Sequence, residues 1–368
     1  MLLRITAIDA RPLRIPLIEP FVIASGTMTE TRALEIELRV GREDGASALG
    51  IGEAATLPPV TAESDGAILE RLARASLLIV GRPFGGLREA SALLDMAAAG
   101  MPVFRAGLEA ALADALGQLA GAPVARLLDE SASACGITLH TDITLPIPRD
   151  PAHAAALATG WAARGFDCFK VKVGRDREAD VRALRAVLEA VPGARIRLDA
   201  NAGYVAADAL ALLDALKDAR ARVECFEQPC GKRDLAGMAE VTRNAGVPVV
   251  ADESVGSDDD LDALLAAGAA SAINLKLVKL GGLLDAHRLG MRARDEGLRL
   301  MAGAMVESRL GLVSMAHVVW ALGGVDWVDL DTALLLADDP YQGGWEAAGP
   351  RLVLGVAPGL GVKRKDPT

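Results

Sequence analysis

The chain has 368 residues, a net charge of −10 and a hydrophobic fraction of 51%. Its length suits one large domain with an accessory domain, or two to three average domains, with a core that needs no disulfide or metal staple. The acidic balance argues against nucleic acid or an anionic membrane as the partner. No apolar run reaches the roughly 18 residues of a membrane span. We therefore expect a homo-oligomer that binds a small molecule.

The cysteines and the first residues indicate the compartment. No cysteine belongs to a CxxC pair, and three of the four stand in apolar or strand-like surroundings, which is typical of reduced core residues. The four are Cys135, Cys168, Cys225 and Cys230. Thr6 and Asp9 interrupt the first apolar residues too early for a signal peptide. These features predict a cytoplasmic protein.

The first third of the chain predicts an α+β domain. Apolar and polar residues first alternate as in strands, and helical spacing follows. The predicted strands span 5–15 and 33–40, and the predicted helices span 63–78, 87–98 and 104–120. Residues 20–29 between the strands predict a loop, which is either a connection or a lid over a site.

From about residue 136, short apolar strands alternate with helices. Eight strands joined by seven helices predict a parallel (β/α)7β barrel of the TIM type rather than an open sheet. The predicted strands span 141–146, 168–173, 196–200, 223–227, 249–252, 272–277, 300–304 and 327–330, and the helices 151–164, 176–191, 206–219, 235–245, 257–267, 283–296 and 310–322. We assign 131–331 to this catalytic barrel and 1–130, completed by 332–368, to an α+β capping domain with lid loops.

Two lysines stand two residues apart in the apolar run 168–174. Side chains alternate along a strand, so Lys170 and Lys172 point the same way. Their repulsion and their burial would lower a lysine pKa toward neutrality, which suits a general base. The alternative is an exposed edge strand with solvated lysines.

Three carboxylates end three successive predicted strands, namely Asp199, Glu227 and Asp252. The carboxyl ends of barrel strands gather at one face, so these groups should meet. They would repel one another without a cation, and an all-oxygen set favours Mg²⁺ or Mn²⁺. The alternative is that they are three unrelated helix N-caps.

Lys172 and Lys276 fall on predicted strands that lie across the barrel from each other. One could remove a proton from a bound substrate and the other return one from the opposite side. The proton α to a carboxylate most needs such help, because its loss makes an enediolate that a metal stabilises. Lys170 would help to keep Lys172 neutral. A Schiff-base lysine, as in an aldolase, is the competing use.

Asp329 and Asp331 stand two residues apart on the last predicted strand and should share a face. The neighbouring sequence offers no cation to balance them, so a substrate ammonium is a candidate partner. The alternative is that one of them pairs with an arginine such as Arg309 or caps a loop.

These motifs together resemble the muconate-lactonizing subgroup of the enolase superfamily, over almost the whole chain. The motifs that carry the resemblance are Lys170-Val171-Lys172, Asp199-Ala200-Asn201, Glu227-Gln228-Pro229, Ala251-Asp252-Glu253-Ser254 and Asn274-Leu275-Lys276. The resemblance implies a barrel with an α+β capping domain. It also implies Lys172 and Lys276 as the acid/base pair, Lys170 as their support, and Mg²⁺ on the three carboxylates.

Within that subgroup, Asp329-Leu330-Asp331 is similar to the Asp-x-Asp motif of dipeptide epimerases of the L-Ala-D/L-Glu epimerase type, where it holds the free amino group of the dipeptide. Thr144, Met305 and Glu307 match positions near the substrate of that family. The resemblance therefore implies an isomerase that inverts the α-carbon of the C-terminal residue of a dipeptide.

The first lid loop bears on the side chain of that residue. Enzymes that act on Ala-Glu carry an arginine there, where this chain has Ser25 or Gly26. The resemblance thus implies a hydrophobic or small uncharged side chain, with Ser25 as a candidate contact. The alternative is that Arg32 or another arginine takes the place of the missing one. The alternatives are an N-acylamino-acid racemase, an o-succinylbenzoate synthase, a cycloisomerase or a dehydratase of the same subgroup, and a non-catalytic binding protein on the same fold.

Overall fold

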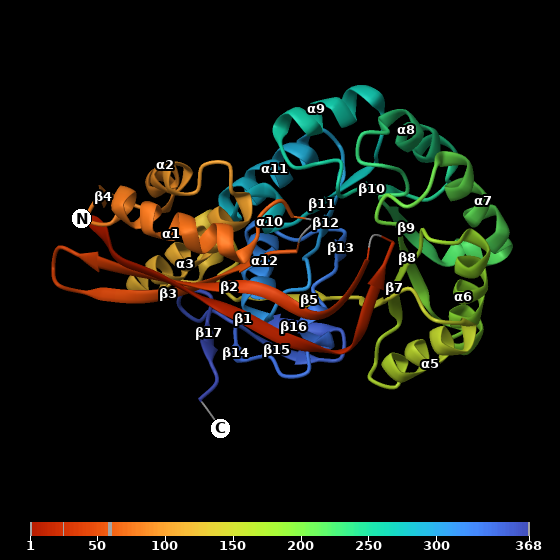
Figure 1. Cartoon of the computed structure of the whole chain (residues 1–368), viewed down its shortest axis with the longest axis horizontal. Helices are drawn as coiled ribbons and strands as arrows, with labels where there is room; N and C mark the ends of the chain where they lie inside the picture. The colour runs from red at the N-terminus through yellow and green to blue at the C-terminus, as the bar shows by residue number, and fades with distance from the viewer. Residues whose placement is uncertain (1, 25, 58–60, 367–368) are drawn as a thin grey trace.

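The computed structural model describes residues 2–24, 26–57 and 61–366, which form a capping region and a barrel beside it (Figure 1). The capping region is an antiparallel sheet in the order β3-β2-β1-β4 with helices packed against it. Its elements are β1 (Leu3–Ile23), β2 (Gly26–Arg42), β3 (Ser47–Ala55), β4 (Pro83–Phe84), α1 (Asp65–Ile79), α2 (Leu87–Ala97), α3 (Pro102–Ala120) and α4 (Val124–Leu128). The predicted α+β organisation of this part is confirmed.

The predicted loop at 20–29 is wrong over most of its length. β1 continues to Ile23 and β2 begins at Gly26, so the segment is the tip of a long hairpin in which Phe21 pairs with Met28. The reason is apolar burial, because Phe21 and Ile23 pack with Val306 of the barrel in a small hydrophobic cluster. The hairpin therefore reaches over the barrel.

Helix α3 joins the capping region to the barrel. Its residues 103–117 are all buried. Gly50 and Gly52 allow β3 to approach closely, because a Cβ on either would overlap the α3 backbone. On the barrel side, Arg105 donates to the carbonyl of Gly281 at 2.5 Å.

The barrel is a single sheet of eight parallel strands in the order β6 to β13, and a bridge between Thr141 and Val328 joins its two edges. The strands are β6 (Ile143–Leu145), β7 (Cys168–Lys172), β8 (Arg195–Asp199), β9 (Val223–Glu227), β10 (Val249–Ala251), β11 (Ala272–Leu275), β12 (Arg299–Ala302) and β13 (Trp327–Val328). The predicted (β/α)7β barrel is confirmed.

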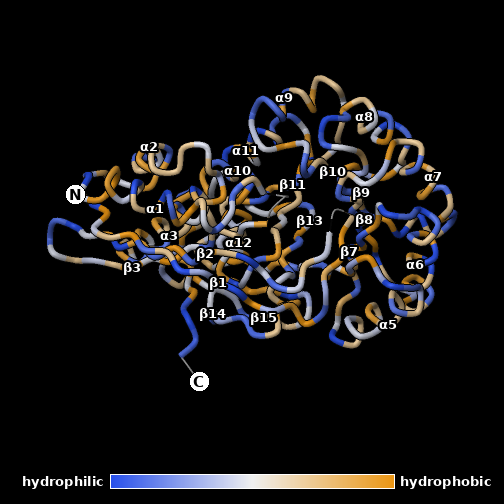
Figure 2. Tube along the Cα trace, in the orientation of Figure 1, coloured by the Kyte–Doolittle hydropathy of each residue, from blue (hydrophilic) through white to orange (hydrophobic). Residues whose placement is uncertain are grey.

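Helices surround the barrel, and hydrophobic and hydrophilic residues alternate along them, as on α6 and α7 in Figure 2. They are α5 (Pro151–Ala162), α6 (Arg177–Ala190), α7 (Ala206–Leu216), η1 (Lys217–Arg222), α8 (Leu235–Asn244), α9 (Asp258–Ala267), α10 (Leu277–Leu280), α11 (Leu283–Asp295), α12 (Arg309–Ala321) and η2 (Thr332–Leu335). Within the described ranges, no helix has both the length and the apolar character to cross a membrane. The four cysteines are unpaired, and all but Cys135 are buried.

The C-terminal segment contributes short strands outside the barrel. They are β14 (Tyr341–Gly343), β15 (Trp345–Ala348), β16 (Arg351–Leu354) and β17 (Val362–Arg364), and β16 also pairs with β5 (Ile137–His140). Arg364 forms ion pairs with Glu35 and Glu37 of β2, and the Leu360 N–H donates to Asp114 of α3 at 2.8 Å. The tail thus contacts the capping region, while the exact domain boundaries stay a prediction.

Six of the barrel strands are shorter than predicted, and in two of them the difference affects candidate site residues. β11 ends at Leu275, so Lys276 is the N-cap of α10. β13 ends at Val328, so strand alternation does not align Asp329 with Asp331. The chain turns away at this point because the Leu330 N–H donates to the Thr141 hydroxyl at 2.9 Å instead of continuing the ladder.

Candidate active site

Two buried lysines of β7 point into the barrel beside the same carboxylate. Lys172 Nζ donates to Asp199 Oδ2 at 2.5 Å, and Lys170 Nζ lies 3.1 Å from that oxygen. The prediction that both lysines face one way is confirmed. The alternative of an exposed edge strand is wrong, because β7 lies between β6 and β8 in the sheet.

The predicted lowering of the lysine pKa is wrong for Lys170. Burial disfavours its ammonium form, but the charges of Asp329, Glu227 and Asp199 outweigh burial and raise the pKa of Lys170 well above its ordinary value. Lys170 Nζ lies 2.6 Å from Asp329 Oδ2 and 2.7 Å from Glu227 Oε2. These carboxylates come from other strands, so they are not visible around Lys170 in the sequence.

Asp199, Glu227 and Asp252 form a buried group, here called the first trio. They end or follow three adjacent strands, and Asp199 and Glu227 pair directly between β8 and β9. The alternative that they are helix N-caps is wrong, because other residues cap the helices that follow. Those caps are Val205, Asp234 and Ser257.

Lysines from the far side of the barrel complete the surroundings of the first trio. Lys276 Nζ lies 2.7 Å from Asp252 Oδ2 and 3.9 Å from Glu227 Oε1. Lys279 Nζ donates to Asp252 Oδ1 at 2.6 Å. Lys279 was not predicted, and the signal that could have found it is its position one helical turn after Lys276 on α10.

The charges explain how three acids share one site. Burial would raise the pKa of Asp199, but the ammonium groups of Lys172 and Lys170 lower it below its usual range. Burial and the charge of Asp199 raise the pKa of Glu227. Within the described residues, Glu227 Oε2 makes no hydrogen bond. It faces the Lys170 ammonium at 2.7 Å instead. Three buried carboxylates from adjacent strands supply an all-oxygen set that fits a hard divalent cation such as Mg²⁺.

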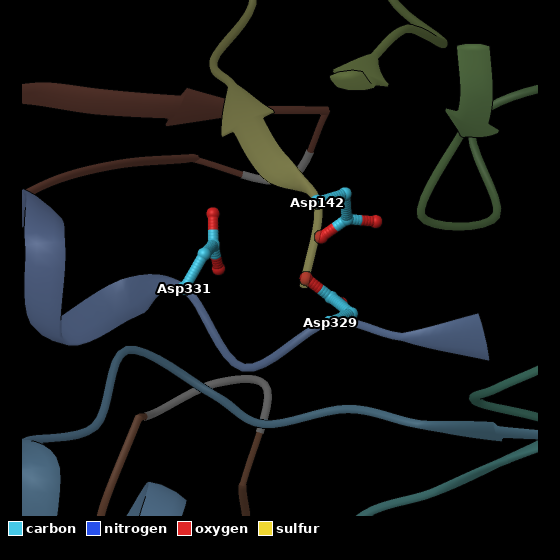
Figure 3. A group of neighbouring side chains, drawn as sticks. All are labelled: Asp142, Asp329 and Asp331. Carbon is cyan, nitrogen blue, oxygen red and sulfur yellow. The ribbon is translucent and has the colours of Figure 1, made fainter. Parts of the chain in front are cut away.

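Asp142, Asp329 and Asp331 form a second trio, in which one oxygen of each lies within 4.8 Å of the others (Figure 3). The two predicted aspartates therefore do come together, but Asp142 was not predicted. The sequence around Asp329 offers no cation, and its protein cation comes from a distant strand, because Lys170 of β7 lies 2.6 Å from it. The alternative partner Arg309 is wrong, since its guanidinium donates to backbone carbonyls.

The second trio is only partly satisfied. Asp142 Oδ2 accepts from Arg197 at 2.8 Å, and Asp331 Oδ2 accepts from the Thr144 N–H at 2.5 Å. The other oxygen of Asp142 and of Asp331 is buried and has no partner in the described part of the chain. Burial and the charge of Asp329 raise the pKa of Asp331 to about 7. A ligand that brings N–H donors and positive charge would satisfy both oxygens.

A cavity of about 190 Å³ lies between the hairpin and the barrel, and within the described part of the chain one residue of each trio lines it. Lys172 and Lys276 both line it, and so do Asp252 and Asp329. Its remaining walls are largely apolar. They include Phe21, Ile23, Met28, Leu57, Met305 and Val306. The barrel thus supplies the charged floor of the cavity, and the hairpin supplies much of its apolar cover.

The residues predicted to contact the substrate do not all line this cavity. Thr144 and Met305 line it, whereas Glu307 is buried, is not among the lining residues, and accepts from the Met305 N–H at 2.8 Å. Ser25 lies outside the described residues. The roles of Thr144, Met305 and Glu307 toward a substrate stay predictions.

Two family models and several relatives match this chain. The family model described as mandelate racemase/muconate lactonizing enzyme, N-terminal domain, matches residues 6–129, and the model described as enolase C-terminal domain-like matches residues 153–367. The aromatic dipeptide epimerase of Herpetosiphon aurantiacus is 38% identical over 97% of this chain and 98% of its own. The L-Ala-D/L-Glu epimerase of Bacillus subtilis is 30% identical over 98% of this chain and 97% of its own.

A solved structure extends the comparison to the fold. The dipeptide epimerase from Enterococcus faecalis, complexed with Mg and the dipeptide L-Leu-L-Tyr, has a TM-score of 0.89 and 31% identity, covering 98% of this chain and 100% of that one. The resemblance inferred from the motifs is confirmed. The chain belongs to the mandelate racemase/muconate lactonizing enzyme family of the enolase superfamily, among relatives of the dipeptide epimerase type.

Proposed function

We propose that the chain is a Mg²⁺-dependent isomerase that epimerises dipeptides at the α-carbon of their C-terminal residue. The observation that carries the proposal is the placement of Lys172 and Lys276. Their strands β7 and β11 stand four positions apart in the eight-stranded barrel, and both side chains line the same cavity. A carbon bound between them meets one amine on each face.

The two lysines would exchange the proton in this arrangement. One amine removes the α-proton from one face, and the opposite ammonium returns a proton to the other face, which inverts the carbon. Contacts of 2.5 Å to Asp199 and 2.7 Å to Asp252 hold the two Nζ atoms at the cavity floor. Lys170 would add a fixed positive charge beside them.

The first trio would hold the metal. Mg²⁺, or Mn²⁺ in its place, would supply positive charge for the carboxylate oxygens of the enediolate. The lysines that pair with Asp199 and Asp252 lower the pKa of both carboxyl groups and would keep them ionised. Lys170 and Lys276 would help to hold Glu227 in place.

The second trio would recognise the free amino group of the dipeptide. An ammonium could donate to the oxygens of Asp329, which lines the cavity, and of Asp331, whose Oδ1 has no partner in the described residues, and balance the excess negative charge there. An N-acylamino acid carries no ammonium and would leave these oxygens unsatisfied, which favours a dipeptide over the alternative substrates of the family.

The side chain at the reacting carbon would be uncharged. Apolar residues of the hairpin cover the cavity, and no arginine lines it within the described ranges. The relative at 38% identity bears the name aromatic dipeptide epimerase, which supports the same choice. Lys232 is exposed and also lines the cavity, and its ammonium could pair with an acidic side chain. L-Ala-L-Glu is therefore the acidic dipeptide to compare with the uncharged ones.

Solvent exchange tests the proposal directly. Protein with Mg²⁺ is incubated in D₂O with a library of L-Ala-L-X dipeptides, and mass spectrometry reads the gain of one deuterium. We expect exchange with uncharged residues X, its loss in Lys172→Ala, and its retention in Lys363→Ala, a matched change of an exposed lysine on β17. Absence of exchange with every dipeptide, from folded protein that binds Mg²⁺, contradicts the proposal.

We also propose a cytoplasmic homo-oligomer. The unpaired cysteines suit a reducing compartment. Leu69 and Leu77 of α1 and Met96 of α2 are exposed apolar side chains that a subunit contact would cover. Light scattering tests the assembly, and a monomeric mass at micromolar concentration contradicts it.

A further inference from the structure

A second, smaller cavity adjoins the first. Its volume is about 90 Å³, several times the ~30 Å³ of a water molecule in the liquid. It shares Phe21 and Thr144 with the first cavity. Its other walls are largely apolar and include Leu157 and Trp161 of α5 and Leu335 of η2, while the exposed Glu19 is the one charged side chain among the described residues that line it. The proposed mechanism makes no use of this apolar space.

Thr144 places the second cavity next to the site for the amino group. Its backbone N–H donates to Asp331 Oδ2 at 2.5 Å, and the residue forms part of both cavities. An ammonium held by Asp329 and Asp331 would therefore lie beside the wall that the two cavities share. The α-carbon of the N-terminal residue is one bond from that nitrogen, so its side chain begins at the same wall.

The reacting carbon fixes the other half of the dipeptide. Lys172 and Lys276 line the first cavity and are not among the residues of the second. The C-terminal residue, whose α-carbon must lie between these two lysines, therefore occupies the first cavity. The side chain of the N-terminal residue needs a separate space close to the ammonium.

We infer that the second cavity receives the side chain of the N-terminal residue and selects apolar side chains there. The inference rests on the proposed function. The Trp161 ring is held in place by an edge-on contact with Phe166 at 5.5 Å and by the Arg164 guanidinium 4.1 Å from its centroid. A fixed ring beside Leu157 and Leu335 forms a preorganised pocket for a branched aliphatic side chain such as leucine.

Filling the cavity tests the inference. Leu157→Trp places an indole in the space, so kcat/KM for L-Leu-L-X should fall by about tenfold or more relative to L-Ala-L-X, where X is the best C-terminal residue of the wild type. Ala156→Trp is the matched control, because Ala156 is the exposed neighbour on α5. It should leave the ratio of the two kcat/KM values unchanged.

The reverse change keeps the test decisive if the tryptophan variant does not fold. Leu157→Ala enlarges the cavity and should favour L-Phe-L-X over L-Ala-L-X by about threefold or more relative to the wild type. An unchanged preference at the N-terminal residue in a folded variant, with exchange of L-Ala-L-X retained, overturns the inference and leaves the proposed function standing. Absence of exchange with every dipeptide in the wild type overturns both.

Discussion

The barrel contains two groups of three buried carboxylates that differ in what balances their charge. Four lysine side chains pair with the first trio, namely Lys170, Lys172, Lys276 and Lys279. Among the described residues, the second trio shares Lys170 with the first and adds only Arg197. Two of its oxygens have no partner in the described residues.

The difference separates two kinds of binding site. In the first trio, where protein cations already face the carboxylates, the pKa values of Asp199 and Asp252 are lowered, which suits the proposed metal site. Where protein cations are too few, a buried carboxylate stays costly until a ligand supplies both charge and N–H donors. The same chemical group can thus prepare a metal site or an amine site, depending on its counter-charges.

Asp199→Asn tests the first trio and should have the largest effect of these substitutions. The change removes one negative charge from the proposed metal ligands, so we expect kcat/KM to fall by about 10³-fold and Mg²⁺ affinity to fall with it. Solvent exchange and calorimetric titration measure the two effects. Asp218→Asn, at an exposed position of η1, should change neither.

Asp331→Asn tests the second trio. We expect a loss of about 10²-fold in kcat/KM for dipeptides with unchanged Mg²⁺ affinity, because the ammonium loses a charged partner. The wild-type kcat/KM should also rise with pH through about 7, where Asp331 becomes ionised. A parallel loss of Mg²⁺ affinity would show that the two trios do not act separately.

Asp142→Asn should act mainly on stability. It removes one of the two carboxylate partners of the buried Arg197 guanidinium, at 2.8 Å, and leaves Glu224 at 2.9 Å, so we expect a loss of at most about 3 kcal/mol of unfolding free energy. Urea denaturation measures the loss. The double variant Asp142→Asn/Arg197→Met should recover part of it, and a single-variant loss below ~1 kcal/mol would count against this pairing.

Glu53 is a buried carboxyl group whose hydrogen-bond partners are neutral. Of the four substitutions, a change at Glu53 should have the smallest effect. It accepts from the N–H groups of Ser308 and Gly311 at the start of α12. Burial and the charge of Glu307 raise the pKa of Glu53 to about 8, above the ordinary value of 4.5.

The folded protein therefore binds more protons than the unfolded one between these pH values, and stability falls as pH rises from about 5 to 8. Glu53→Gln removes this titration, so its unfolding free energy should depend less on pH, by at most ~1.4 kcal/mol per pH unit. Thermal denaturation at several pH values measures the slope. An equal slope in both proteins contradicts the raised pKa.

The sequence predicts best what depends on local periodicity. The alternation of apolar strands with helices is enough for the barrel, and the spacing of Lys170 and Lys172 is enough for their shared face. The family resemblance and the three strand-end acids follow from residues that stand close together in the chain.

Other features depend on residues that meet only in the folded chain. The charge state of Lys170 is set by Asp329, which is 159 residues away. Asp142 lies before β6 rather than at a strand end, so no pattern in its neighbourhood connects it with Asp331. The hairpin tip is another case, because the burial of Phe21 against Val306 overrides the polar, glycine-containing composition that predicts a loop.

The hairpin has a consequence for how such a protein can change over generations. Phe21, Ile23 and Met28 cover the cavity from β1 and β2, whereas Lys172 and Lys276 belong to the barrel. Under the proposed function, variation in one short N-terminal segment could therefore alter which side chain the cavity admits without changing the two lysines proposed to transfer the proton. Mutations in the hairpin could thus change the preferred dipeptide while the barrel residues proposed to carry out the reaction stay the same.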